Sequence, residues 1–207
     1  MDALEHITEL SLFPLQTVLF PGGQLPLKVF EQRYIDLVRD SVRDRTGFGV
    51  CMLAPNDNGP TGIARIGTYV EIEDWYLRDD GLLGITTKGI RRFRMSRIWA
   101  QDNGLLCAEV TWVDETTAPV PAECGVLVTL LRQIAEQTKA PMPDMNEPNM
   151  DEASYVSNRL AELLPLEILE RQQLLEAVDP VERLRKIFIM LRDLQARQDD
   201  EEPGLDS

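Results

Sequence analysis

Residue pairs that favour hairpin turns recur through the central part of the chain and constrain its fold more than any other feature. Between residues 48 and 115, apolar and polar residues alternate with the period of two that is typical of β-strands. This alternation is interrupted by Asn58-Gly59, Asp80-Gly81, Lys88-Gly89 and Asn103-Gly104. The pattern predicts short antiparallel strands at residues 48–53, 63–66, 68–76, 82–87, 91–99 and 105–114. Such regular short strands favour a barrel or a sandwich over a parallel sheet with crossover helices.

The segment before these strands combines extended pieces with one helix. Residues 10–27 are apolar and contain Pro14, Pro21 and Pro26, which confine extended segments to short strands with edges or bends. Residues 30–45 then show a helical period that is expected to end near Gly47. The apolar face of this helix is predicted to consist of Phe30, Tyr34, Leu37, Val38, Ser41 and Val42.

The last part of the chain has a helical period. Apolar stripes predict helices at residues 124–134, 151–164, 168–177 and 181–194, with a loop at 141–150 and a break at Pro165. Asp179 and Pro180 form a typical capped start for the last helix. We therefore expect a β lobe at residues 8–117, a helical lobe at 118–197 and a disordered acidic tail at 198–207.

The net charge of −14 restricts the classes of partner. Nucleic acids and anionic membranes attract basic surfaces, so both are disfavoured. The first residues carry acids where a secretory signal needs positive charge, and no apolar run approaches the roughly 18 residues of a membrane span. Cys51, Cys107 and Cys124 form no Cys-x-x-Cys pair and are expected to be buried free thiols. These features predict a cytoplasmic protein without a membrane partner.

Motifs for the common enzyme chemistries are absent from the sequence. It has no phosphate-binding Gly-x-x-x-x-Gly-Lys-Ser/Thr loop and no Gly-x-Gly-x-x-Gly segment. Its one histidine is His6, near the terminus, and no serine and lysine are placed as a serine–lysine catalytic dyad would require. We therefore expect no catalytic residue, no metal and no cofactor.

Two charged clusters leave other functions open. Glu71, Glu73 and Asp74 could serve a small enzyme that uses surface carboxylates, or they could simply be a solvated strand face. The cluster Arg91-Arg92-Phe93-Arg94 with Arg97 could contact RNA, with Arg92, Arg94 and Ser96 on one face. Alternatively, these arginines pair with nearby acids, which the acidic balance favours.

Several motifs together resemble a known family. Leu12-Phe13-Pro14-Leu15, Val18-Leu19-Phe20-Pro21-Gly22 and Phe30-Glu31-Gln32-Arg33-Tyr34 closely resemble the start of the Lon protease N-terminal domain, especially its free-standing bacterial versions. Gly89-Ile90-Arg91-Arg92-Phe93-Arg94 is similar to a strand of that family, and Ala161-Glu162-Leu163-Leu164-Pro165-Leu166 is similar to its helical end. The resemblance covers residues 8–194. It implies an α+β fold: a PUA-like pseudo-barrel β domain with an inserted helix, followed by a small C-terminal helical bundle.

The resemblance also implies a function. In Lon proteases this domain recognises substrate proteins, whereas ATP hydrolysis and peptide cleavage belong to later domains whose motifs are absent here. We therefore expect a non-catalytic module for protein or unfolded-peptide clients. An adaptor role in proteolysis or quality control, with a separate protease as partner, is left open by the sequence. An RNA-binding PUA-like module and a small carboxylate enzyme are the alternatives, and no oligomeric state is predicted.

A groove between the two lobes is a plausible site for an apolar peptide, because domain junctions provide concave surfaces. The candidate lining residues are Phe13, Phe20, Pro21, Tyr34 and Phe93. Each is also of a type that packs protein cores, and that interpretation stays open.

Overall fold

A computed structural model describes residues 8–53, 62–138 and 147–201, which divide into two compact units. The first unit contains the chain up to Asp114 together with Leu166–Glu176, and the second contains Glu115–Pro165 and the residues from Ala177 onward. Among the described residues, no helix is long and apolar enough to cross a membrane.

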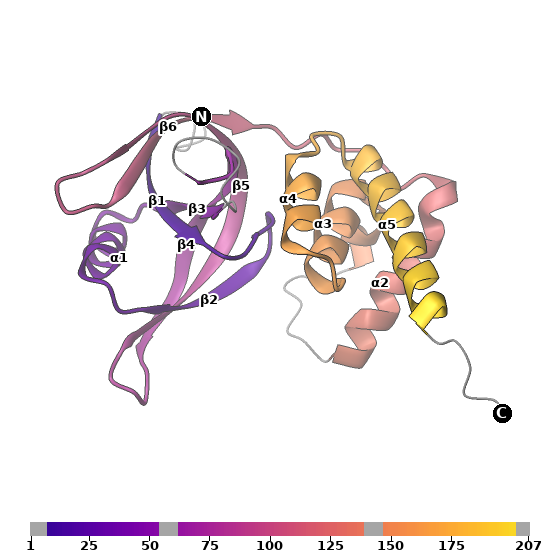
Figure 1. Cartoon of the computed structure of the whole chain (residues 1–207), viewed down its shortest axis with the longest axis horizontal. Coiled ribbons are helices and arrows are strands. Elements are labelled where there is room, and N and C mark those ends of the chain that lie inside the picture. Colours follow the sequence, from indigo (N-terminus) through magenta and orange to yellow (C-terminus); the bar gives the residue numbers. More distant parts are fainter. Residues whose placement is uncertain (1–7, 54–61, 139–146, 202–207) are drawn as a thin grey trace. The chain divides into compact units, whose positions relative to one another are not determined.

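A mixed β-sheet forms the first unit (Figure 1). Its strands are β1 (Glu9–Leu15), β2 (Gln24–Val29), β3 (Phe48–Met52), β4 (Ile66–Leu77), β5 (Leu83–Ala100) and β6 (Leu106–Val113). The strand order is β2-β5-β4-β3-β1-β6, and an additional β5–β6 pairing closes β5, β4, β3, β1 and β6 into a ring. Among the strands that the structure describes, β1 and β3 are the one parallel pair. The predicted barrel-like α+β fold is confirmed.

Two of the predicted turns are present, and one prediction is wrong. Gly81 and Gly104 adopt φ values of 77° and 80°, as their tight turns require. Lys88-Gly89 forms no turn, because β5 runs through it without interruption. Gly89 instead exchanges backbone hydrogen bonds with Gly22 and Gly23, and a Cβ at Gly89 would lie 2.4 Å from the Phe20 carbonyl oxygen. The glycine thus permits a close backbone approach inside a strand.

The strand boundaries differ from the prediction at one further place. No separate strand forms at residues 63–66; Ile63 makes an isolated bridge with Leu53, and Ile66 is already the first residue of β4. The predicted Asn58-Gly59 turn lies outside the described residues.

The inserted helix is α1 (Gln32–Asp44), which packs Tyr34, Leu37 and Val38 into the core of the barrel. Two residues predicted on this buried face are exposed instead. Phe30 precedes the helix and is 65% exposed, and Val42 is 43% exposed. The observed helix begins two residues after the predicted start, because Glu31 has an extended backbone and is the N-cap.

Helix α4 (Ile168–Glu176) belongs to the first unit, although it was expected in the helical lobe. Gln172 Nε2 donates to the Ile66 carbonyl oxygen at 3.0 Å, and Arg92 Nη1 donates to the Leu175 carbonyl oxygen at 2.6 Å. A guanidinium that is fully buried needs such acceptors, and the last turn of a helix offers free carbonyl groups.

The second unit contains the remaining helices. These are η2 (Ala122–Cys124), α2 (Gly125–Thr138), η3 (Glu147–Asp151), α3 (Ala153–Leu163) and α5 (Pro180–Glu201). The predicted cap of the last helix is confirmed, because the Val181 amide donates to Asp179 Oδ1 at 2.9 Å. Two expectations are wrong in part: a 3-10 helix begins at Glu147 within the predicted loop, and α5 continues to Glu201 into the predicted disordered tail. Residues 202–207 are not described.

Cys51, Cys107 and Cys124 are buried free thiols, as expected. Burial raises the pKa of the Cys51 thiol from 9.0 to about 12. The thiol therefore stays protonated in the folded protein at pH values at which the same thiol begins to ionise in the unfolded chain. We expect thiol reagents near pH 8 to label Cys51 about a thousandfold more slowly in the folded protein than in the unfolded chain.

Mass spectrometry of timed labelling reactions measures this difference, with the urea-unfolded chain as the reference. Because the raised pKa belongs to the folded state, stability is expected to fall as the pH rises from about 9 towards 12. Rapid labelling of Cys51 in the folded protein would contradict the burial.

Candidate functional site

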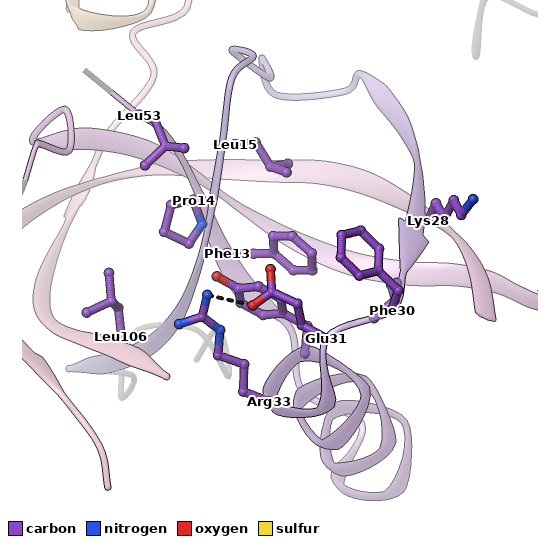
Figure 2. Close-up of a pocket in the computed structure, with 11 residues that line it drawn as sticks. Phe13, Pro14, Leu15, Lys28, Phe30, Glu31, Arg33, Leu53 and Leu106 are labelled. Atoms are coloured by element: carbon purple, nitrogen blue, oxygen red, sulfur yellow. Dashed lines mark ion pairs between the residues drawn. The ribbon is translucent and has the colours of Figure 1, made fainter. Parts of the chain in front are cut away.

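An open pocket of about 350 Å³ lies in the first unit, where the ends of β1 and β2 meet the start of α1 (Figure 2). Its walls are mostly apolar. The lining residues are Phe13, Pro14, Leu15, Lys28, Val29, Phe30, Glu31, Arg33, Tyr34, Leu53 and Leu106. This lining contains no serine, cysteine or histidine, and its apolar side chains offer a binding surface.

Stacked aromatic rings form the floor of the pocket. The rings of Phe13 and Tyr34 lie 4.0 Å apart at an interplanar angle of 15°, and Phe48 packs against Phe13 at 5.9 Å. All three side chains belong to the buried core. Burial also raises the pKa of Tyr34 above its ordinary value. The floor is therefore part of the packed barrel, already shaped without a ligand.

The rim of the pocket carries exposed apolar groups. Phe30 is 65% exposed because it stands between Val29, the last residue of β2, and Glu31, the N-cap of α1. Leu53, which follows β3, is also exposed. A large aromatic side chain left in solvent beside an apolar pocket marks a candidate interaction surface.

The charged groups of the rim neutralise one another. Arg33 Nη2 lies 2.7 Å from Glu31 Oε2, and Arg33 Nη1 donates to the Gly104 carbonyl oxygen at 2.9 Å. The same guanidinium lies over the Tyr34 ring at 4.7 Å. Lys28 pairs with Asp80 at 2.8 Å. Because these cations already have partners, the pocket favours an apolar group over an ion.

The structure brings together only some of the predicted site residues. Phe13 and Tyr34 line the pocket. Phe20 and Phe93 are fully buried and do not line it, and Pro21 is half-buried in the turn that precedes β2. Phe30 was assigned to the helix core, so its place on the rim was missed. The sequence signal that could have indicated its exposure is its position between the extended segment that ends before it and the helical pattern that begins after it.

The arginine cluster is largely engaged within the protein. The sequence predicts Arg92, Arg94 and Ser96 on one face. Arg92 is buried against α4, whereas Arg94 and Ser96 are exposed. Arg91 pairs with Asp114, and Arg97 lies 3.7 Å from Glu109. The alternative interpretation of the cluster, pairing with nearby acids, matches these contacts.

The carboxylate cluster lies beside a second, smaller pocket of about 290 Å³ that also belongs to the first unit. Glu71 and Glu73 line it, and Glu73 accepts a hydrogen bond from Gln24 Nε2 at 2.7 Å. Within the part of the chain that the structure describes, no three His, Cys, Asp or Glu side chains are grouped so that they could hold a metal ion.

Comparison with known proteins shows the family to which the chain is related. Residues 9–193 match the family model of the ATP-dependent protease La (LON) substrate-binding domain. The chain belongs to the LON substrate-binding domain family. A crystal structure of a Lon N-terminal domain protein from Xanthomonas campestris is similar with a TM-score of 0.76 and 40% identity, over 88% of this chain and 98% of that chain.

Full Lon proteases are more distant relatives. The Lon protease of Anaeromyxobacter dehalogenans is 25% identical over 192 residues and Lon protease 2 of Myxococcus xanthus is 27% identical over 192 residues. These matches cover 88% of this chain but only 23% of each relative, so the LON chain spans about a quarter of their length. The N-terminal domain of a Mycobacterium avium complex Lon protease shares the fold, with a TM-score of 0.62 at 20% identity over 86% of this chain and 95% of that chain.

Proposed function

We propose that this LON domain is a non-catalytic module that binds apolar segments of unfolded proteins in the pocket between β1, β2 and α1. The observation that carries the proposal is Phe30, which is 65% exposed at the rim of a preformed apolar pocket. Burying such a side chain against a ligand contributes about 1.5–3 kcal/mol.

The size and chemistry of the pocket support a peptide as the ligand. A volume of about 350 Å³ is at the lower end of the roughly 300–1,000 Å³ of small-molecule sites, and it has room for a large apolar side chain. The internally paired charges of Arg33 and Glu31 leave the apolar surface to select the ligand.

The family relationship supports a role in proteolysis. The matching family model describes a substrate-binding domain, and the matched relatives are proteases. We propose that the chain presents clients to a separate protease as an adaptor. Its free thiols suit a reducing compartment, so we place this activity in the cytoplasm.

The pocket is tested with the variant Phe30→Ala. We expect it to weaken binding of a fluorescein-labelled peptide rich in leucine and phenylalanine by roughly tenfold, because the variant removes the exposed aromatic ring of the rim. Fluorescence anisotropy measures the affinity.

Phe188→Ala is the matched control. Phe188 is also a partly exposed phenylalanine but lies on α5 in the second unit, so its loss should leave the affinity unchanged. A peptide that binds the wild type and Phe30→Ala equally well, or no binding of the apolar peptide above its serine-substituted counterpart, would refute the pocket as the client site.

A further inference from the structure

Half of strand β4 has an open edge. Strand β3 pairs with β4 only at Thr68–Val70, whereas β4 pairs with β5 along its whole length to Leu77. Among the residues that the structure describes, β4 therefore has a hydrogen-bonded neighbour on one side only from Glu71 to Leu77. Figure 1 shows the turn that joins β4 to β5 at the end of the sheet, and β2 pairs with this part of β5 on the side away from β4. Open edges of this kind can accept an additional strand.

The alternation of the ladder shows which backbone groups point outward. The Arg78 amide donates to the Leu82 carbonyl oxygen at 2.9 Å, so the backbone groups of Tyr76, two residues earlier, also point towards β5. The backbone groups of Trp75 and Leu77 then face the open edge. The Trp75 amide donates to Asp74 Oδ1 at 2.8 Å, so this carboxylate occupies the place of an incoming strand's carbonyl group.

An apolar face accompanies the open edge. Trp75 lies opposite Ile85 and Leu77 lies opposite Leu83, so both continue the face that is buried in the barrel. Beyond the core they are left 62% and 78% exposed. Trp75 also lines the pocket of about 290 Å³, beside Val42 from α1. An added strand would place its own side chains beside Trp75 and Leu77 on the same face, as β3 does along the earlier part of β4.

The charge of the edge selects the partner. Glu71, Asp74 and Asp79 are exposed and make no ion pair with any residue that the structure describes, and Arg45 is the cation that lines the pocket beside Glu71. A second copy of this acidic chain would place carboxylates against carboxylates. A partner with basic residues would instead gain ion pairs at the rim.

We propose that the edge of β4 at Glu71–Leu77 binds an extended peptide segment of alternating apolar and basic residues by strand addition. This second site rests on its own contacts and does not depend on the pocket beside Phe30. On binding, a carbonyl group of the peptide replaces Asp74 as the acceptor for the Trp75 amide, and Asp74 becomes available to a basic side chain of the peptide.

The test uses the full chain and three labelled peptides: one that alternates valine and lysine, one with glutamate in place of lysine, and the valine–lysine peptide with every backbone amide N-methylated, so that neither of its edges can donate to β4. We expect the first to bind more weakly as salt rises, and the other two to bind at least roughly tenfold more weakly. Leu77→Pro removes a backbone amide that faces the open edge, so it should cause a similar loss of peptide affinity. The fold should tolerate this substitution, because proline is accepted in a strand where the amide faces away from the ladder.

Phe188→Ala, on α5 in the second unit, is the control and should bind the valine–lysine peptide as the wild type does. Equal binding of the N-methylated peptide would refute strand addition, and equal binding of the glutamate peptide would refute the charge preference. Concentration-dependent dimerisation that Leu77→Pro abolishes, without peptide binding, would assign the edge to a second copy. If Leu77→Pro does not fold, the N-methylated peptide still decides.

Discussion

Replacing the buried Arg183 with leucine is expected to lower the free energy of unfolding by about 3 kcal/mol. Arg183, at the start of α5, is fully buried. Its guanidinium donates to Asn158 Oδ1 at 2.5 Å and to the Ala177 carbonyl oxygen at 2.8 Å, and it lies 3.5 Å from Glu115 Oε2. Leucine removes this donor from several buried acceptors at once, and a buried acceptor that loses its donor is destabilising.

Arg185→Leu is the matched control on the same helix. Arg185 is mostly exposed and lies 3.3 Å from the equally exposed Glu123, so its loss should cost less than about 1 kcal/mol. Urea unfolding followed by far-ultraviolet circular dichroism compares the two variants, because the second unit is helical. Equal stabilities for Arg183→Leu and Arg185→Leu would show that the buried network contributes little to stability.

The order of the elements could be predicted because local periods determine it. The alternation after residue 48 and the Asp179-Pro180 cap are local signals, and both correspond to elements of the structure. Gly89 and α4 were misassigned because their roles depend on distant partners. Residue 89 must be glycine because a side chain there would collide with the Phe20 carbonyl oxygen, and α4 supplies the Leu175 carbonyl oxygen that accepts a hydrogen bond from Arg92. A single sequence does not reveal such long-range contacts.

Of the candidate site, the sequence pointed only to the aromatic residues that form the floor of the pocket. Phe13 and Tyr34 come from motifs on separate elements, and the fold stacks them at 4.0 Å. Phe30 was missed because exposure of an aromatic residue depends on where a strand ends and a helix begins, and such boundaries shift by a residue or two. The open edge of β4 was invisible for another reason: it depends on how far β3 extends along β4.

Phe93→Ala is expected to destabilise the first unit by about 3–5 kcal/mol. The ring is fully buried, and it packs directly on the backbone of two strands. A Cβ at Gly49 would lie 2.6 Å from Phe93 Cζ, and one at Gly67 would lie 2.8 Å from it. Because the ring fills the space that these glycines leave, the strands cannot collapse into the cavity without breaking their pairing.

Tryptophan fluorescence during urea unfolding measures this loss, because Trp75, Trp99 and Trp112 all lie in the first unit. Phe30→Ala should change stability by less than about 1 kcal/mol while it weakens peptide binding. The two phenylalanines therefore separate a core role from a binding role. A Phe93→Ala protein that keeps its stability but loses the apolar peptide would mean that Phe93 contacts the ligand, and the site would then lie elsewhere than the pocket at Phe30.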